Sequence, residues 1–182
     1  MTPRILVLCT GNVCRSPLAE QLLRSALGDA AEVTSRGTRA WPGQPFSPEM
    51  AALLLERTGI DARTPGAVRL TAPDVRAADL VLGMERAHRA AAVRLHPPAV
   101  RRVFTLTEFA RLVSETQPPS AEGGAEVLAA LVARAHRGRR PVPAEFDDIV
   151  DPIGQPQAVY EAVFDQIDEA VRRVARVIGP AG

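Results

Sequence analysis

The sequence predicts an α/β fold in which helices cover both faces of a parallel sheet. Short apolar runs typical of buried strands alternate with segments of helical periodicity. The composition is that of an ordinary globular protein, with 46% hydrophobic and 24% charged residues. Strands that alternate with helices are typical of a parallel sheet with helices on each side, which is the basis of the prediction.

The expected elements follow one another in a regular order. The expected strands are Arg4–Leu8, Glu32–Ser35, Leu80–Gly83 and Val100–Thr105. The expected helices are Pro17–Leu27, Pro48–Thr58, Glu85–Leu95, Leu106–Ser114, an alanine-rich segment at Ala125–Ala135, and a final helix at Ala158–Val177. Apolar residues recur at helical spacing through the final helix and are expected in the core: Val159, Val163, Phe164, Ile167, Val171, Val174 and Ile178.

The length of the chain predicts a single domain over residues 1–182. The segment Glu115–Gly124 is rich in Pro, Gly, Ser and Glu, a composition typical of a solvated loop. We interpret the region around 115–145 as an insertion into this domain.

The net charge, the apolar runs and the cysteine content indicate which partners and which cellular compartment to expect. A net charge of +1 argues against nucleic acid, which requires a strongly basic face. The apolar run Ile5–Leu8 is too short for a signal peptide or a membrane span, so we expect a cytoplasmic protein without a membrane partner. Its only cysteines, Cys9 and Cys14, lie close together and fit a local chemical role in a reducing compartment.

Metal binding is not expected either. The three histidines, His88, His96 and His136, have no metal-ligand spacing. We therefore expect no metal and no organic cofactor.

The pattern of residues in Ile5–Pro17 predicts a buried strand, then a short polar loop, then the start of a helix. Ser16 is expected as the helix N-cap, with Pro17 at the first helical position. The loop then lies at the carboxyl end of a strand and the positive end of a helix, where backbone N–H groups form an anion site.

Residue types in this loop predict nucleophilic chemistry on a phosphate. Cys9 lies within reach of the loop amides, so its pKa is expected to be depressed and its thiolate to be the nucleophile. Arg15, six positions later, offers a planar fork of donors suited to two phosphate oxygens. Gly11 permits a tight turn, and Asn12 tolerates a left-handed conformation.

At these residues the chain resembles a known family. The run Cys9-Thr10-Gly11-Asn12-Val13-Cys14-Arg15-Ser16 is similar to the Cys-x5-Arg-Ser phosphate loop of the low-molecular-weight protein tyrosine phosphatases. Ser35–Gly43 resembles the segment after that family's second strand, and Ala78–Met84 resembles its third strand; the 115–145 region has no counterpart. The resemblance implies a three-layer sandwich around a mostly four-stranded parallel sheet, and a substrate site formed by the loop residues.

The resemblance also implies a general acid near the C-terminus, where Asp151-Pro152 stands before the last helix. A leaving oxygen departs faster when a positioned carboxylic acid protonates it, and we assign that role to Asp151. Pro152 disfavours helical dihedrals at Asp151 and so helps hold it on a loop. Asp147 and Asp148 could replace it in another register, although we expect both to lie in a solvated turn.

Four neighbouring features are interpreted by the same resemblance. Cys14 can form a reversible disulfide with Cys9, or it can simply pack under the loop. The Ser16 hydroxyl is expected to hydrogen-bond the Cys9 sulfur. Ile153 follows where the family often has an aromatic wall for the tyrosine ring. Trp41 is therefore the remaining wall candidate, with a packing anchor as the alternative.

The resemblance implies a phosphatase that acts on tyrosine-phosphorylated proteins through a cysteinyl-phosphate, and we expect a monomer. A relative that hydrolyses phosphoarginine carries Thr where this chain has Val13, so phosphoarginine ranks second. Thiol-dependent arsenate reduction on the same fold stays open, because it needs only one cysteine. A non-catalytic phosphate-binding module would be the natural interpretation only if Cys9, Arg15 or Asp151 were missing.

Overall fold

The computed structural model describes residues 1–62, 66–114 and 123–179. Four strands form one parallel sheet in the order β2-β1-β3-β4. The strands are β1 (Arg4–Cys9), β2 (Glu32–Gly37), β3 (Leu80–Gly83) and β4 (Val103–Thr105). The helices are α1 (Arg15–Leu27), α2 (Pro48–Thr58), α3 (Ala72–Ala77), α4 (Arg86–Leu95), α5 (Leu106–Ser114), α6 (Gly124–Gly138) and α7 (Gln157–Ile178).

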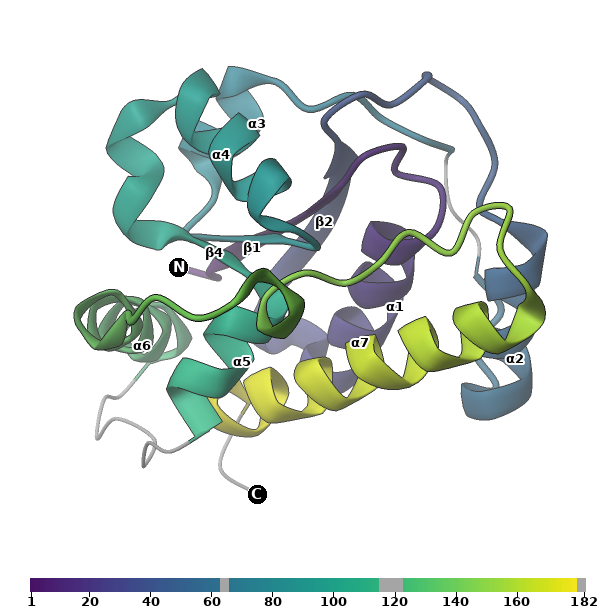
Figure 1. Ribbon diagram of the computed structural model, residues 1–182. Helices are drawn as coiled ribbons and strands as arrows, with labels where there is room; N and C mark the ends of the chain where they lie inside the picture. Colours follow the sequence, from purple (N-terminus) through teal and green to yellow (C-terminus); the bar gives the residue numbers. More distant parts are fainter. Residues whose placement is uncertain (63–65, 115–122, 180–182) are drawn as a thin grey trace.

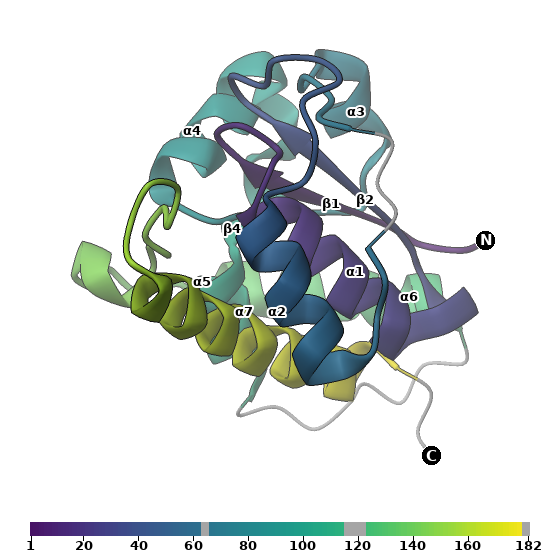
Figure 2. The same ribbon diagram turned by 90° about the vertical axis from the view of Figure 1, so that its right-hand side faces the viewer.

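The helices form a layer on each side of the sheet, which confirms the predicted three-layer α/β architecture. Helices α3 and α4 cover one face, and α1, α2, α5 and α7 pack together on the other (Figures 1 and 2). Helix α7 crosses the whole second layer and contacts α1, α2 and α5. Helix α6 lies at one side, against α5 and the 3₁₀ turn η2 (Pro97–Arg102).

Strand β1 shows why the two layers need two separate cores. Its side chains alternate in direction, because successive residues of a strand point to opposite faces. Ile5, Val7 and Cys9 join the large core under α1 and α7, whereas Leu6 and Leu8 join the smaller core under α3 and α4. All five side chains are buried, so β1 is apolar from Ile5 to Cys9, as expected for a central parallel strand.

Most of the predicted boundaries hold, and the exceptions have local causes. The fourth strand begins at Val103 and not at Val100, because Pro97–Arg102 forms the 3₁₀ turn η2. Helix α3 was not predicted; it is six residues long, too short for apolar periodicity to be recognised. Of the core positions predicted in α7, all are buried except Val159, which is partly buried near the start of the helix.

Most of the predicted loop Glu115–Gly124, residues 115–122, lies outside the described residues, and its last residue, Gly124, is the first residue of helix α6. The remainder of the 115–145 region contains helix α6 and the short turn η3 (Ala144–Phe146). Leu128, Leu131 and Ala135 of α6 are buried in the large core. This helix therefore contributes apolar side chains to the core.

Two adjacent leucines of α2 test how the core stabilises the fold. Leu54 is fully buried, whereas Leu55 is 52% exposed. We expect Leu54→Ala to lower the free energy of unfolding by about 2–5 kcal/mol, because it leaves a cavity in the large core. Leu55→Ala, the matched control, should change it by less than about 0.5 kcal/mol. Urea denaturation followed by circular dichroism measures both, and equal losses would contradict the packing described here.

Candidate active site

The site is built around the loop between β1 and α1. Cys9 is the last residue of β1, and Arg15 is the first residue of α1. Both are almost fully buried, with exposed fractions of 2% and 1%. The loop thus joins the carboxyl end of a central strand to the amino end of a helix, as predicted, and the first amides of α1 face the loop without helical partners.

The predicted helix start needs one correction. Helix α1 begins at Arg15, the N-cap position is Cys14, and no side chain caps it. Ser16 therefore lies inside the first turn and is not the N-cap. Its hydroxyl donates to the Cys9 Sγ instead, at 3.0 Å. Pro17 is tolerated at the third helical position because the N–H it lacks would have no helical partner there.

Two donors converge on the Cys9 sulfur. One is the Ser16 hydroxyl, and the other is the backbone N–H of Asn12 at 3.2 Å. The contact between Ser16 and Cys9 confirms the expectation from the sequence. A negative charge on Sγ would be stabilised by both donors, since each points its hydrogen at the sulfur.

Asn12 holds the loop in this shape. It is the only described non-glycine residue with a positive φ, 57°, in the left-handed region that Asn tolerates. Its Nδ2 donates to the hydroxyls of Ser16 (3.1 Å) and Ser35 (2.8 Å), and its Oδ1 accepts from the Val68 N–H (2.8 Å). Ser35 in turn donates to the Glu20 carboxylate at 2.6 Å. The roles of Ser35 and Glu20 were not predicted from the sequence, because they depend on contacts between residues that are far apart in the chain.

Gly37, at the end of β2, allows the neighbouring loop to approach. A Cβ at this position would lie 2.7 Å from the Thr10 carbonyl oxygen and 2.9 Å from the Asn12 nitrogen. Both are backbone atoms of the site loop, which cannot move aside without changing its shape. The glycine is thus required by close packing between two backbones.

Arg15 is fixed by three acceptors. Its Nη1 donates to the Glu85 carboxylate and to the Ile149 carbonyl oxygen (2.8 Å). Its Nη2 donates to Asp151 Oδ2 at 2.6 Å. The structure therefore brings Asp151 directly to the guanidinium, although the two are far apart in sequence. Asp151 is half exposed, with 44% of its side chain accessible, so it lies at the mouth of the site.

The solvated turn expected at Asp147 and Asp148 is wrong. Asp147 is 4% exposed and pairs with Arg86 and Arg111, while Asp148 accepts from the Arg86 N–H at 2.7 Å. These carboxylates fasten the segment before Asp151 to α4 and α5. No local pattern could have predicted these pairs, because both arginines are distant along the chain.

The remaining predicted residues lie as follows. Cys14 is buried and, like Cys9, is a free cysteine. Burial, reinforced by the nearby Cys9, raises the pKa of the Cys14 thiol and keeps it protonated. Trp41 is 80% exposed, which excludes the packing anchor and leaves the wall as its predicted role. Thr10, Gly11 and Val13 belong to the loop itself.

His88 links the loop to the turn that carries Glu85. Its Nδ1 accepts from the Glu85 N–H at 3.0 Å, so its Nε2 carries the proton and donates to Thr10 Oγ1 at 3.0 Å. The ring is 3% exposed. Burial lowers the pKa of His88, and this outweighs the Glu85 carboxylate, which acts in the opposite direction. His88 thus ties together a residue next to Cys9 and a residue bound to Arg15.

No group of three or more His, Cys, Asp or Glu suited to a metal ion occurs among residues 1–62, 66–114 and 123–179. In the same part of the chain, no helix has both the length and the apolar character needed to cross a membrane. The reactive groups that the site brings together are the Cys9 sulfur, the Arg15 guanidinium and the Asp151 carboxyl group.

Comparison with known proteins identifies the family. Residues 4–134 match the low molecular weight phosphotyrosine protein phosphatase family. The chain belongs to this family. Its relatives include the "Probable low molecular weight protein-tyrosine-phosphatase EpsP" of Ralstonia solanacearum, 40% identical over 60% of this chain and 74% of that protein. A protein-arginine-phosphatase of Geobacillus stearothermophilus is 31% identical over 96% of this chain and 95% of that protein.

Solved structures agree with this assignment. The low molecular weight protein tyrosine phosphatase from T. tengcongensis is 30% identical, covers 94% of this chain and 97% of its own, and superposes with a TM-score of 0.70. The YwlE arginine phosphatase from Geobacillus stearothermophilus is 30% identical with a TM-score of 0.71, over 96% of this chain and 91% of its own. Phosphatases named for tyrosine and for arginine thus share this fold.

The lowered pKa of His88 predicts a pH dependence of stability. Between the folded pKa and the unfolded value of about 6.5, the unfolded chain binds more protons, so folding stability falls as the pH drops through this window. Above about pH 6.5 His88 is neutral in both the folded and the unfolded chain, so its titration costs the fold no stability there. His88→Asn keeps an acceptor for Glu85 N–H but cannot titrate, so we expect it to lose less stability between pH 7 and pH 5 than the wild type does. Urea denaturation at each pH measures the difference.

The ring is surrounded by Glu85, Arg15, Asp151 and Asp148, whose charges are the same in the wild type and the variant. The difference between the two curves of unfolding free energy against pH therefore gives the effect of titrating the imidazole. Parallel curves would contradict a buried neutral His88.

Proposed function

We propose that this protein is a phosphatase that hydrolyses phosphotyrosine in proteins through a cysteinyl-phosphate on Cys9. The observation that carries the proposal is the convergence of donors at the Cys9 sulfur beside a buried guanidinium. The sulfur receives hydrogen bonds from Asn12 and Ser16, and Arg15 is held rigid by Glu85 and the Ile149 carbonyl. Membership in a phosphatase family supports a catalytic role for this arrangement.

In the first step the Cys9 sulfur attacks phosphorus. An S–P bond forms and the P–O bond to the phenolic oxygen breaks. Arg15 and the loop amides hold the non-bridging oxygens, where negative charge is concentrated in the transition state. The Asp151 carboxyl donates its proton to the departing oxygen, so the leaving group is a neutral phenol.

The contact between Arg15 and Asp151 suggests how substrate sets the acid in place. In the free protein, Asp151 Oδ2 accepts from Arg15 Nη2. A bound phosphate offers two oxygens to the guanidinium fork and takes the place of the carboxylate. Asp151, at the half-exposed mouth of the site, then takes a proton from the solvent and is free to face the bridging oxygen as the acid.

In the second step water attacks phosphorus and the S–P bond breaks. Asp151, now a carboxylate, takes a proton from the water, and inorganic phosphate is released. The electron pair of the S–P bond returns to the Cys9 sulfur, where the Ser16 hydroxyl and the Asn12 N–H receive the charge. Ser16 thereby assists the breakdown of the intermediate more than its formation.

Two substitutions separate the roles of nucleophile and acid. Cys9→Ser should abolish hydrolysis of a phosphotyrosine peptide, because the sulfur that forms the intermediate is lost. Asp151→Asn should lower kcat by about 10²–10⁴-fold, the range for loss of a general acid. Stopped-flow and steady-state kinetics measure both effects. Asp165→Asn on the outer face of α7 is the control and should leave kcat unchanged; an active Cys9→Ser variant would exclude the proposal.

A second substrate class, phosphoarginine, is favoured by the similarity to protein-arginine-phosphatases over nearly the whole chain. We rank it below phosphotyrosine because Val13 presents only methyl groups at the loop position where the phosphoarginine enzyme carries Thr. We expect the wild type to cleave phosphotyrosine peptide faster than phosphoarginine peptide. Val13→Thr, nearly the same size, should lower that ratio of kcat/KM.

The assay compares both peptides with arsenate in the presence of a reduced thiol, under one buffer. Faster turnover of phosphoarginine by the wild type would replace the first proposal with the second. Arsenate reduction without phosphatase activity would assign the thiol-dependent reductase reaction instead. Binding of both phosphopeptides without turnover of any compound would leave a phosphate-binding module.

We further propose a monomer that works in the cytoplasm on tyrosine-phosphorylated proteins. Support comes from the two free cysteines, one of them the nucleophile, which a reducing compartment preserves. Sedimentation equilibrium tests the monomer, and fractionation of the source cells tests the compartment.

A further inference from the structure

A second cleft lies at the opposite end of the sheet from Cys9. It has a volume of about 730 Å³ and is formed by the end of α3, the segment before β3, the turn η2 and one face of α6. The segment before β3 and the turn η2 lead into the amino ends of β3 and β4, whereas the site loop follows the carboxyl end of β1 in the same parallel sheet. The six residues of β1 alone measure about 20 Å, so the two sites are separate.

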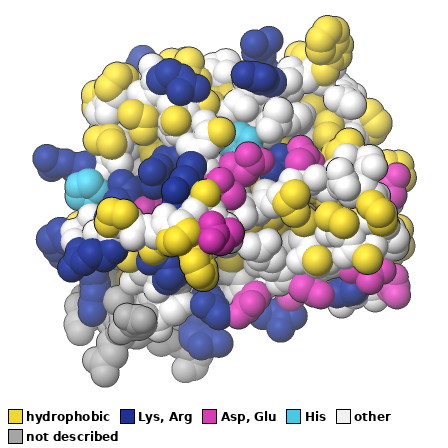
Figure 3. All heavy atoms as spheres, in the orientation of Figure 1, with side chains coloured by type: hydrophobic (Ala, Val, Ile, Leu, Met, Phe, Trp, Pro, Cys, Tyr) yellow, Lys and Arg dark blue, Asp and Glu magenta, His cyan; other side chains and the backbone are white. Residues whose placement is uncertain are grey.

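Among the described residues, positive charge predominates at the rim of this cleft. Arg76, Arg101, Arg102 and Arg137 line it, and within the described ranges none of them pairs with a carboxylate. The one carboxylate in the lining, Asp79, accepts from the Arg4 N–H at 2.8 Å. Figure 3 shows basic side chains gathered on the side of the molecule that carries α6.

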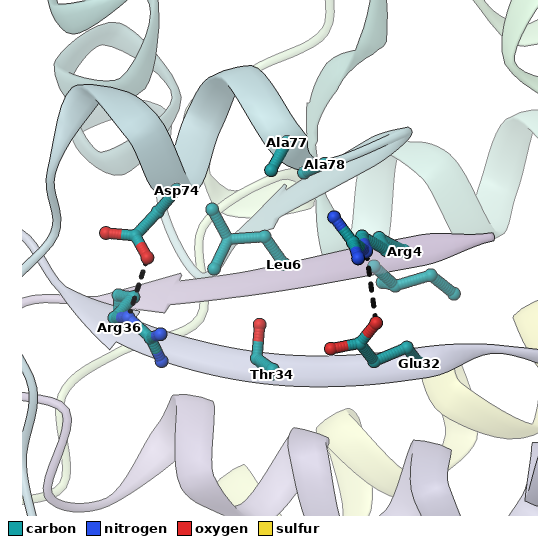
Figure 4. Close-up of a pocket in the computed structure, with 9 residues that line it drawn as sticks. Arg4, Leu6, Glu32, Thr34, Arg36, Asp74, Ala77 and Ala78 are labelled. Carbon is teal, nitrogen blue, oxygen red and sulfur yellow. Dashed lines mark hydrogen bonds and ion pairs between the residues drawn. The ribbon is translucent and has the colours of Figure 1, made fainter. Parts of the chain in front are cut away.

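A neighbouring hollow shows that unpaired arginines are not the general rule. Between β1, β2 and α3, Arg36 pairs with Asp74 at 3.0 Å and Arg4 pairs with Glu32 at 3.1 Å (Figure 4). Charges there cancel within the protein. In the cleft beside α6 they do not, although the net charge of the whole chain is only +1.

Two residues that line the cleft also carry buried polar atoms without hydrogen-bond partners in the described residues. Three buried side-chain nitrogen or oxygen atoms have no hydrogen-bond partner in the described part of the chain, and two of them, Arg102 Nε and His136 Nδ1, belong to residues that line this cleft. Arg102 Nη2 makes only long contacts of 3.4 Å, to the Val75 and Arg76 carbonyl oxygens. A buried polar group without a partner is unfavourable, so both side chains would gain from a movement that turns these atoms toward acceptor oxygens in the cleft.

The floor between these groups is apolar. It is formed by Pro98 of η2 and by small side chains of α6: Ala125, Ala129, Val132 and Ala133. Small side chains leave room for a flat body against the helix. The volume lies within the range of about 300–1,000 Å³ typical of small-molecule sites, and such sites combine an apolar lining with a few polar groups.

We propose that this cleft binds a small organic anion, with two or more acidic groups on a flat apolar body. The guanidinium groups of Arg101, Arg102 and Arg137 hold the acidic groups, and the alanine face of α6 receives the body. An acidic protein segment is the weaker candidate, because a concave cleft with buried donors suits a compact ligand. The site is independent of the phosphatase proposal, since it shares no residue with the site loop.

The test uses naphthalene-1,3,6-trisulfonate, an anion with this shape and no phosphate ester. Isothermal titration calorimetry of the full-length protein, with saturating inorganic phosphate to occupy the site loop, should give saturable binding with a stoichiometry of one. The double variant Arg101→Gln/Arg137→Gln should raise Kd roughly tenfold or more, because hydrogen bonds to charged groups are lost. Arg94→Gln removes an exposed arginine outside the cleft and should leave Kd unchanged.

A second pair of variants tests shape without altering charge. Ala129→Trp fills the floor and should abolish binding, whereas Ala130→Trp, on the next residue of α6 and outside the lining, should not. Aryl phosphate hydrolysis should be the same in both, which separates this result from any failure of the phosphatase proposal. Absence of saturable binding, equal Kd values in all variants, or binding of an acidic peptide but not of the trisulfonate would each overturn the proposal.

Discussion

The shape of the active-site loop depends on the side chain of Asn12. Its amide reaches Ser16, Ser35 and the Val68 N–H at once, and its backbone takes a left-handed conformation that most residues avoid. These contacts turn the Asn12 N–H toward the Cys9 sulfur and keep the Ser16 hydroxyl beside it. Because the whole arrangement is buried, each donor that lost its partner would carry a desolvation cost, so the loop has one favoured geometry.

A second set of contacts fixes the guanidinium that would bind phosphate. Arg15 is almost fully buried, a position that a charged group occupies only when paired. Glu85 supplies the countercharge from the turn after β3, and His88 ties that turn to Thr10. Asp147, paired with Arg86 and Arg111, anchors the segment that brings the Ile149 carbonyl and Asp151 to the same guanidinium. Three separate parts of the chain thus meet at Arg15.

The two ends of the parallel sheet differ in how their charges are arranged. At the carboxyl end, the buried Arg15 is matched by carboxylates and a carbonyl, and an incoming phosphate would replace one of them. At the amino end, the arginines around the α6 cleft have no such partners in the described residues. Parallel strands point all their carboxyl ends at one edge, which leaves the other edge free to present a separate surface.

The alternation of strands and helices, except for the short helix α3, and the buried β1 could be predicted from the sequence alone, and the sequence also singled out Cys9, Arg15 and Asp151 as candidates. Strand alternation is a local pattern, whereas the Cys-x5-Arg run and the Asp-Pro pair match motifs of a known family, and both kinds of signal can be recognised without coordinates. The roles of Ser35, Glu20, Glu85 and His88, the burial of Asp147 and the close approach at Gly37 were decided only by tertiary structure. The physical reason is that each depends on a partner distant in the chain, and no periodicity or spacing encodes which distant groups will meet.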